Sequence, residues 1–457
     1  MKKTLLFTVL YCVSCVAGLV QAETTALVGG RLIDGYGHQP LANSVVLIRD
    51  GVIEQVGTIA TLPVPNGYTV VSTEGMDVLP GLWENHAHLM LNGHANYAHW
   101  DKAYINRLSD EIMPASALQL LLAGVTSARD LGAPLKDSLS VKRRIETGEI
   151  PGPRLFISGP FLQHRAYPGT EAFRWSINGV KDAQQKVDKL AEAGVDIIKL
   201  IDQDKMTLQE AQAIVTQAHK HGLKVVAHAH RPDEIRRGLA IGVDNFEHTG
   251  LTTAPGFPED VLNQLKERTA TGRVAGGPLF WTPTVEGLWN YDLTVANPEH
   301  LDADCWQRGL KPDTVADIKQ SLLQPGKLAY MQLTPLRKPT LKNKIAQLRE
   351  AGVVFLVGTD SGIPTKFHCQ STWNELSVWV DVMGISAMDT IRAATYWPAV
   401  MMGVSDKVGT VSEGKYADII AVKGDVLRYI NKLSDVSLVM KNGKIYRQNG
   451  IVHEDSL

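Results

Sequence analysis

Two histidines stand two positions apart in the segment GLWENHAHLM (residues 81–90), directly after an apolar run. If this run is a strand, His86 and His88 project from the same face near its end, because side chains alternate along a strand. Two imidazoles alone are a weak sign of metal binding. Similar residues recur at the ends of other strand-like segments, namely Lys199, His228, His248 and Asp360. Histidines at strand ends, closed by an aspartate, form a metal-ligand pattern.

Lys199 is the most informative of these residues. It lies in the apolar, β-branched segment DIIKL, and a strand of this type is buried in a parallel sheet. A buried ammonium is costly and would repel a neighbouring metal ion. Carboxylation by CO₂ removes the conflict, because a carbamate is an anion whose two oxygens can bridge two cations. Burial favours this reaction, since it lowers the pKa of the lysine and supplies the neutral amine that reacts with CO₂.

Strand and helix patterns alternate through the middle of the chain and predict a parallel sheet with crossover helices. Eight strands are expected at residues 78–88, 124–132, 154–162, 195–202, 224–230, 243–250, 279–287 and 353–362. This order is typical of a (β/α)8 TIM barrel, an α/β fold whose chemistry lies at the C-terminal ends of the strands. The candidate metal ligands all fall at such ends.

Helices are expected between most of these strands. Residues 181–194 and 207–222 show helical patterns that stop at a glycine. The interval 288–345 is polar and interrupted by prolines, and we expect extra helices there or a lid over the site. Both chain ends are rich in short strand patterns cut by turns. Their similar texture predicts one small β-sandwich domain built from residues 23–79 and 405–457, with the barrel over residues 80–404.

Residues 1–22 show the pattern of a cleavable signal peptide, with two lysines before an apolar run and VQA at its end. The run is short for a membrane span. We therefore expect a periplasmic or secreted protein that has no membrane attachment after cleavage. Two cysteines then remain, and the sequence leaves open whether Cys305 and Cys369 form a disulfide. The formal charge of −2 argues against a nucleic-acid partner, which would require a basic surface.

In these motifs the chain resembles the amidohydrolase superfamily, in its subtype with two metals and a carboxylated lysine. The segments LPGLWENHAHL, DIIKL, VVAHAH, FEHTG and GTDSG resemble the motifs of strands one, four, five, six and eight. Glu84 departs from the pattern, because the family usually has Asp there. The likeness covers essentially the whole mature chain. In detail the chain is most similar to the imidazolonepropionase-like branch, which includes Xaa-Pro dipeptidases (prolidases).

The resemblance implies that His86, His88 and Asp360 bind the more buried of two divalent metals. The more exposed metal would take two further histidines and the carboxylated lysine that bridges the ions, namely His228, His248 and Lys199. A hydroxide between the metals would attack the substrate carbonyl, and Asp360 would carry its proton to the leaving amine. Zinc is expected, given nitrogen and oxygen ligands without thiolate, and manganese and cobalt are alternatives.

The substrate contacts are less well defined. His230 could replace His228 as a ligand, although the resemblance favours His228 and turns His230 toward the substrate. A dipeptide hydrolase needs a cation or a hydroxyl for the free carboxylate of its substrate. His230, Arg165 and Tyr167 are candidates, together with His164 on the same loop after the third strand.

The resemblance implies hydrolysis of an amide or peptide bond in a small molecule, with a dipeptide or an N-acyl amino acid as the expected substrate. The same two-metal site could instead cleave a lactone, a cyclic amide or an organophosphate ester. Deaminases of this superfamily usually have one metal and a Glu where this chain has Arg231, which disfavours that activity. An inactive scaffold is the alternative of another class, and the presence of all six ligand residues disfavours it. A homo-oligomer stays open, since relatives often assemble.

Overall fold

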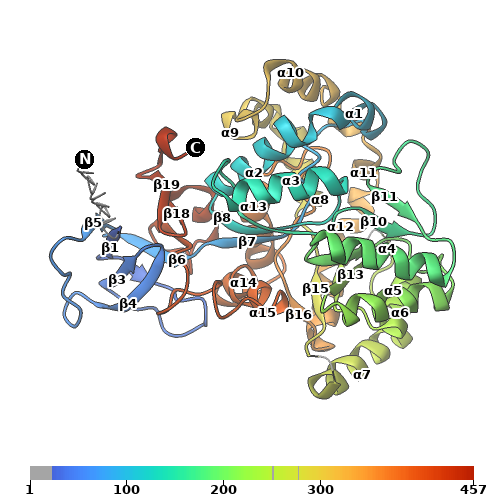
Figure 1. Cartoon of the computed structure of the whole chain (residues 1–457), viewed down its shortest axis with the longest axis horizontal. Helices are drawn as coiled ribbons and strands as arrows, with labels where there is room; N and C mark the ends of the chain where they lie inside the picture. Colours follow the sequence, from blue (N-terminus) through green and yellow to red (C-terminus); the bar gives the residue numbers. More distant parts are fainter. Residues whose placement is uncertain (1–22, 250–251, 276) are drawn as a thin grey trace, which may run out of the picture.

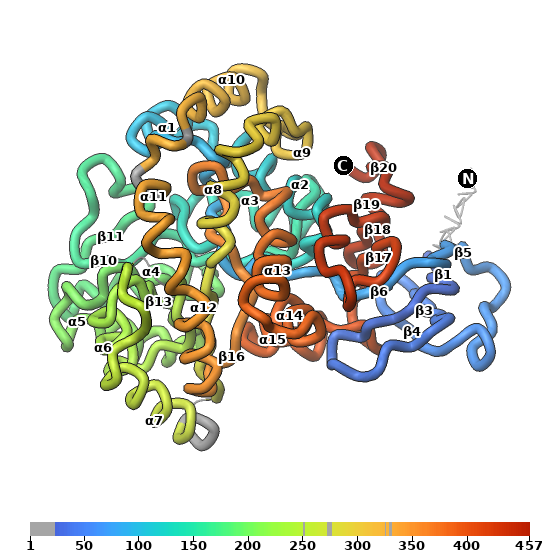
Figure 2. The backbone as a smooth tube through the Cα atoms, turned by 180° about the vertical axis from the view of Figure 1, so that it is seen from behind, coloured from blue at the N-terminus to red at the C-terminus, as the bar shows by residue number. Residues whose placement is uncertain are grey.

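The computed structural model describes residues 23–249, 252–275 and 277–457, and the predicted signal peptide at residues 1–22 lies outside this part of the chain. Figure 1 shows the strands of both chain ends on one side of the molecule, with most helices and the parallel strands on the other. The rear view in Figure 2 shows the same division. Among the described residues, no helix is both long enough and apolar enough to cross a bilayer.

Segments from both ends of the chain form two sheets. The first has the order β4-β3-β1-β5, with β1 Thr24–Val28, β3 Ser44–Arg49, β4 Val52–Thr58 and β5 Thr69–Ser72. The second has the order β2-β6-β17-β18-β19-β20, with β2 Arg31–Leu32, β6 Met76–Pro80, β17 Ile419–Lys423, β18 Val436–Lys441, β19 Lys444–Gln448 and β20 Ile451–Val452. Val46, Val78 and Ile419 belong to one buried cluster that draws on both sheets. The two ends of the chain therefore share a core.

The strands that carry the predicted ligands are parallel and lie in two further sheets. One has the order β7-β8-β9, with β7 Leu82–Ala87, β8 Val125–Asp130 and β9 Arg154–Ile157. The other has the order β11-β10-β12-β13-β14-β15-β16, with β10 Phe161–Gln163, β11 Arg174–Ser176, β12 Ile197–Leu200, β13 Lys224–His228, β14 Asn245–Glu247, β15 Phe280–Thr282 and β16 Val354–Phe355. Backbone hydrogen bonds cross between the sheets, from Asp196 N to Ile157 O (2.9 Å) and from Asp360 N to His86 O (2.7 Å). The α/β fold with parallel strands is confirmed.

Two predicted strands are each divided in the structure. Residues 78–88 separate at Gly81 into β6 and β7, and a Cβ added there would lie 2.1 Å from Thr126 Oγ1 of β8. Residues 154–162 separate into β9 and β10 around Gly159, which has φ +62° and precedes a proline. The prediction of single strands was wrong at both places. At each glycine the chain leaves one sheet and enters another.

The predicted helices are present. α4 (Val180–Ala193) ends at Gly194 in the left-handed conformation, and α5 (Leu208–Lys220) begins with a capping box of Thr207 and Glu210. The interval 288–345 holds the expected extra helices α8 Gly287–Ala296, α9 Asp304–Gln307, α10 Pro312–Ser321, α11 Ala329–Gln332 and α12 Thr334–Glu350. The other α-helices of the described part are α1 Tyr97–Ala103, α2 Met113–Leu122, α3 Leu135–Glu146, α6 Pro232–Ile241, α7 Glu259–Ala275, α13 Ser371–Asp381, α14 Ala387–Ala393 and α15 Tyr396–Met401.

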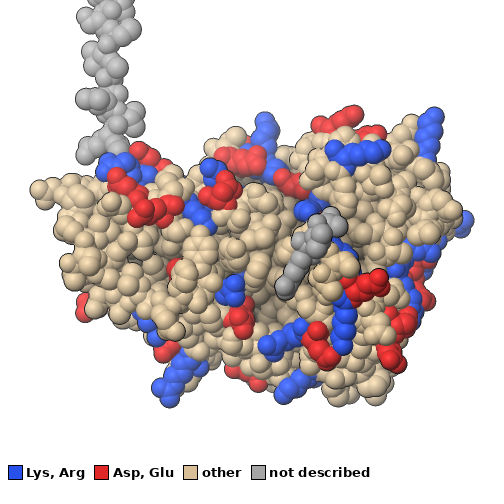
Figure 3. Space-filling model, turned by 90° about the horizontal axis from the view of Figure 1, so that it is seen from below, with Lys and Arg blue, Asp and Glu red and all other residues tan. Residues whose placement is uncertain are grey.

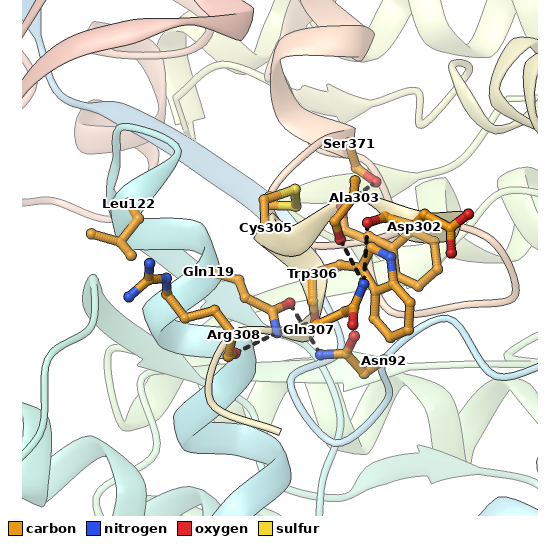
Figure 4. The surroundings of a disulfide bond; sticks show 12 residues. Asn92, Gln119, Leu122, Asp302, Ala303, Cys305, Trp306, Gln307, Arg308 and Ser371 are labelled. Carbon is orange, nitrogen blue, oxygen red and sulfur yellow. Dashed lines mark hydrogen bonds between the residues drawn. A yellow bond between two sulfur atoms is a disulfide. The ribbon is translucent and has the colours of Figure 1, made fainter. Parts of the chain in front are cut away.

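A disulfide joins Cys305 of α9 to Cys369 and ties the inserted helices to the segment before α13 (Figure 4). Trp306 stacks on Phe367 beside it, with ring centroids 4.6 Å apart. Gln119 of α2 donates a hydrogen bond of 2.6 Å to the Trp306 carbonyl oxygen. The pairing that the sequence left open is therefore present in the structure, beside the buried rings of Trp306 and Phe367.

Charged side chains of both signs are interspersed on the face that Figure 3 shows. This distribution matches the composition, because the chain has 46 basic and 48 acidic residues. The face in Figure 3 thus offers no extended basic surface for a polyanion.

Candidate metal centre

The predicted ligands lie at or near the C-terminal ends of parallel strands. They are His86 in β7, His88 after it, Lys199 in β12, His228 at the end of β13, His248 after β14 and Asp360 after β16. The strands thus bring residues from distant parts of the sequence to one region, where they form two groups of metal-ligand type.

The first group consists of His86, His88 and Asp360, whose ligand atoms lie within 4.8 Å of one another. Asp360 Oδ1 is 3.0 Å from His88 Nε2 and 3.5 Å from His86 Nε2. Asp360 has φ 64°, and its amide donates to the His86 carbonyl oxygen, so the backbone turns the carboxylate toward the imidazoles. His86 Nε2 is buried and has no hydrogen-bond partner. A nitrogen of this kind fits a metal ion, which would supply the missing partner.

The second group consists of His228, His230 and His248, again with ligand atoms within 4.8 Å. The His248 ring stacks on His230 with centroids 4.2 Å apart and lies 4.6 Å from the His86 ring, which joins the two groups. His248 Nδ1 is 2.9 Å from Thr284 Oγ1, and its Nε2 remains available as a ligand. Both His228 and His230 belong to this group, so the preference for His228 as the ligand stays a prediction.

Lys199 completes the centre. Its side chain is 0% exposed, and its Nζ atom has no hydrogen-bond partner. Burial lowers the pKa of this amine to about 8, although the Glu247 and Asp360 carboxylates oppose the shift. After burial, the charge of Lys199 is the largest cause of the lowered pKa of His86 and of His228, so the amine lies close to both groups. A buried amine with these properties fits carboxylation.

Four imidazoles of the centre, those of His86, His228, His230 and His248, are neutral at neutral pH. Burial lowers the pKa of His86, His228 and His248 well below the ordinary value, and it lowers the pKa of His230 to about 3. A neutral imidazole offers a lone pair to a metal ion. Burial raises the pKa of Asp360, but interactions with the adjacent imidazoles outweigh it and hold this pKa below its usual range. These four histidines thus offer neutral nitrogen beside one ionised carboxylate.

A buried ion pair between Glu247 and Arg129 contacts His86 on the ring nitrogen opposite its free Nε2. Glu247 Oε2 lies 2.8 Å from His86 Nδ1, and Glu247 Oε1 accepts a hydrogen bond of 2.8 Å from Arg129 Nη2. With Nδ1 donating to this carboxylate, His86 Nε2 keeps its lone pair for a metal ion. Both charged side chains are 0% exposed. This pair was not predicted from the sequence, although a charged residue inside each of the predicted strands 124–132 and 243–250 could have indicated it.

Glu84, which stands where the family usually has Asp, forms hydrogen bonds to the segments that carry His86 and Asp360. Its carboxylate accepts hydrogen bonds from His86 N (2.9 Å), Thr359 N (2.8 Å) and Thr372 Oγ1 (2.8 Å). Burial raises the pKa of Glu84 to about 7. The Glu84 side chain, which is longer than the usual Asp, therefore links β7 to the segment that ends in Asp360 and fixes their relative positions.

We expect Glu247→Gln to weaken both metal binding and folding. The amide still accepts from His86, but it leaves the Arg129 guanidinium buried without a counter-charge, which lowers the unfolding free energy by about 3–5 kcal/mol. Loss of a ligand-orienting carboxylate lowers metal affinity about 10–100-fold. Denaturant titration and metal titration measure the two effects. The control is the double variant Glu247→Gln/Arg129→Met, which should recover stability but not affinity; unchanged affinity in both variants would refute this role.

Two other groups of metal-ligand type do not fit an ion. In the group of His94, His99 and Asp317, His94 Nδ1 accepts a hydrogen bond of 3.0 Å from the Asn96 amide. The His94 proton therefore lies on Nε2, which cannot coordinate. The other group consists of three carboxylates that Arg231 already pairs with, Asp202, Asp204 and Glu234.

A cavity with two lobes opens on the centre. The larger lobe has a volume of about 640 Å³ and the smaller one about 110 Å³, and both are lined by His230, His248 and Asp360. Helix α1 and the segment between β10 and β11 line the larger lobe. Helices α8 and α12 of the inserted interval line the smaller one. The interval expected to form extra helices or a lid thus contributes a wall of the site.

Two of the predicted substrate contacts, Tyr167 and His230, line the larger lobe. Arg165 and His164 line neither lobe. The Gln163 amide donates to the Arg165 carbonyl oxygen, and the Arg165 side chain points to solvent. Two other arginines do line the cavity, Arg174 in the larger lobe and Arg337 in the smaller. They were not predicted, because neither follows the spacing of residues at strand ends.

Comparison with known proteins agrees with this geometry. The chain matches the amidohydrolase family over residues 78–446. An ochratoxinase from Aspergillus niger is 25% identical over 491 aligned residues, which cover 95% of this chain and 89% of that protein. The solved structure of A. niger ochratoxinase has a TM-score of 0.70 at 22% identity and covers 95% of this chain and 99% of its own. A Xaa-Pro dipeptidase with methionine in its active site has a TM-score of 0.69 at 21% identity, with 93% and 100% covered.

Proposed function

Since the chain belongs to the amidohydrolase family and is thus a hydrolase of carbon–nitrogen bonds, we propose that it cleaves an amide or peptide bond in a dipeptide or an N-acyl amino acid. One observation carries the proposal. Two groups of ligand-type atoms meet beside an unpartnered buried amine, at the wall of a cavity that is sized for a small molecule. The similarity in fold to a Xaa-Pro dipeptidase supports a dipeptide substrate.

The residues fit two divalent metal ions, for which we propose zinc because the donors are nitrogen and oxygen. When bound, two such cations polarise the scissile carbonyl and lower the pKa of the attacking water. His86, His88 and Asp360 would hold one ion. The second would take two histidines and share the carboxylated lysine with the first, and these residues are His228, His248 and Lys199.

Asp360 is the proposed proton carrier. Its carboxylate is ionised at neutral pH, and it lines both lobes of the cavity. It can therefore accept a proton from the attacking water and donate that proton to the nitrogen that leaves. The contacts to His86 and His88 hold the carboxylate in one orientation during this exchange.

The smaller lobe supports recognition of a free carboxylate on the amine side of the scissile bond. Its lining includes Arg337 and Lys366, whereas Asp360 is the one carboxylate among its lining residues. Lys366 is also paired with Glu286 at 3.1 Å, and the planar guanidinium of Arg337 is the group of this lobe whose shape matches a carboxylate. A small lobe with this charge suits the released amino acid, and it directs the acyl part of the substrate to the larger lobe.

The finer architecture also belongs to this proposal. We propose that the two parallel sheets form one (β/α)8 barrel, supported by the hydrogen bonds that cross between them. We also propose that residues 23–79 and 405–457 form one β-sandwich domain, supported by their shared core. The signal peptide stays a prediction, and the disulfide supports an oxidising compartment such as the periplasm or the exterior.

A substrate panel on metal-loaded protein tests the function. The panel contains dipeptides, N-acyl amino acids, lactones and phosphotriesters, and metal content is measured on the same samples. We expect two metal equivalents per chain and turnover of the dipeptides or the N-acyl amino acids. Turnover confined to lactones or phosphotriesters would move the assignment to ester hydrolysis. Protein that binds no metal and turns over nothing would support a scaffold.

Recovery of metal-stripped protein should depend on pH through Lys199. With a pKa of about 8, the amine is neutral in about half of the molecules at pH 8 and in about one in a hundred at pH 6. Because only the neutral amine reacts with CO₂, activity should return about 50-fold faster at pH 8. The measurement adds zinc at a fixed concentration of dissolved CO₂ and assays all samples at one pH. Equal rates at both pH values would contradict carboxylation.

A further inference from the structure

Arg174, the first residue of β11, is a cation of the larger lobe without a carboxylate partner. Its Nη1 donates a hydrogen bond of 3.0 Å to Gln163 Oε1, and its buried Nε has no hydrogen-bond partner. Its Cζ lies 4.8 Å from the ring centre of Tyr167, 5.0 Å from that of Phe161 and 5.6 Å from that of Phe173. Within the described part of the chain, no Asp or Glu forms an ion pair with it.

A guanidinium in this setting is only partly compensated. It stays charged at neutral pH, and burial lowers its pKa, which shows that the cavity wall disfavours the charge. Contacts with aromatic rings offset part of this cost, but they engage the face of the group and leave donors on its edge unused. Arg231, which lines the same lobe, differs because its guanidinium already pairs with Asp202 and Asp204. The edge of Arg174 therefore remains for an acceptor on a ligand.

The larger lobe also holds a carboxylate without an ion pair. Asp101 of α1 lines the lobe, and in the described residues its side chain makes neither an ion pair nor a hydrogen bond. Burial raises the pKa of Asp101, and the charge of Arg174 opposes the shift from beyond contact distance. An anion and a cation held apart in one cavity suit a ligand that carries both charges.

We propose that Arg174 is a specificity-determining residue that binds a carboxylate on the acyl part of the substrate, while Asp101 binds the ammonium group of the same part. The inference rests on the proposed function, in which the leaving amino acid occupies the smaller lobe. It names the substrate class as a dipeptide with an acidic N-terminal residue, glutamate or aspartate.

Glutamyl-alanine and glutaminyl-alanine test the inference, because they have nearly the same shape and differ in one charge. For the metal-loaded protein we expect kcat/KM to favour glutamyl-alanine by about tenfold or more. Arg174→Met should reduce this ratio to about one, mainly by slowing glutamyl-alanine, and Arg174→Lys should keep part of the preference. Arg143→Met is the matched control, because Arg143 is an exposed arginine of α3 and its loss changes the net charge equally. Melting curves establish that each variant is folded.

Calorimetry with L-glutamate and L-glutamine, the acyl products, gives a readout that does not require turnover. We expect L-glutamate to bind more tightly, and we expect Arg174→Met to abolish the difference. Equal binding of the two amino acids, or a preference for the acidic dipeptide that survives in Arg174→Met, would overturn the inference. If the protein hydrolyses no member of the substrate panel but binds L-glutamate through Arg174, the proposed function and the dipeptide substrate fail, while the carboxylate-binding role of Arg174 stands. If it hydrolyses other dipeptides without favouring the acidic one, the inference alone fails.

Discussion

Replacement of Lys199 by alanine is expected to remove at least one metal equivalent and to lower kcat/KM by about 10³-fold or more. The physical reason lies in the burial and isolation of the amine. Its Nζ atom is buried without a partner beside both histidine groups, so a carboxylate on this atom is the group that would hold the two ions together. Elemental analysis and steady-state kinetics on the same preparation measure the two effects.

Short carboxylic acids should restore part of the Lys199→Ala activity, because acetate or propionate can occupy the vacated space and supply the missing anion. Lys199→Met fills that space without an amine and should show the same defect without rescue. Lys344→Ala is the matched control, since Lys344 is another buried lysine with a pKa of about 8, but its Nζ donates to Thr252 O at 3.0 Å. This control should keep both metals. If Lys199→Ala keeps both metals and full turnover, the bridging role is wrong.

Asp360→Asn should retain metal while lowering kcat by about 10²–10⁴-fold, the usual contribution of a positioned acid or base. The amide keeps an oxygen that can face an ion, but it cannot accept a proton from the attacking water. The distances of 3.0 and 3.5 Å to the imidazoles show that the side chain is already placed among the proposed ligands. In this variant, metal analysis should therefore give an unchanged metal content, while steady-state kinetics give a lower kcat.

Asp317→Asn provides the comparison for Asp360→Asn. Asp317 also contacts imidazoles, with His99 Nε2 at 2.8 Å, but it belongs to the group whose tautomer does not suit a metal. This variant should keep both metals and near-normal turnover. Normal rates in Asp360→Asn would remove that residue from proton transfer, whatever its role in binding an ion.

The six predicted ligands come together in the structure because their positions follow from regular geometry. A strand fixes the direction of alternate side chains, and parallel strands present their C-terminal ends on one side. His86 and His88 share a face for the first reason, and the distant Asp360 joins them for the second. The glycines at positions 81 and 159 limited the prediction, since local patterns do not tell a continuous strand from one that changes sheets.

The supporting and substrate-binding residues are harder to predict because their partners are distant. Glu247 precedes a predicted ligand in the sequence, but its role follows from Arg129 on another strand. Arg174 and Arg337 reach the cavity from a short extra strand and an inserted helix, where no periodic spacing applies. Arg165 was predicted to bind substrate, yet the exposed side chain does not line the cavity, whereas Arg174 of the same region does.

A crystal structure of the protein grown with zinc and bicarbonate, with anomalous data at the zinc edge, tests the central claim most directly. We predict two anomalous peaks, one beside His86, His88 and Asp360 and the other beside the second histidine group. Density for a carboxylate on Lys199 Nζ should lie between them. An unmodified Nζ with no anomalous peak near either group would contradict the account.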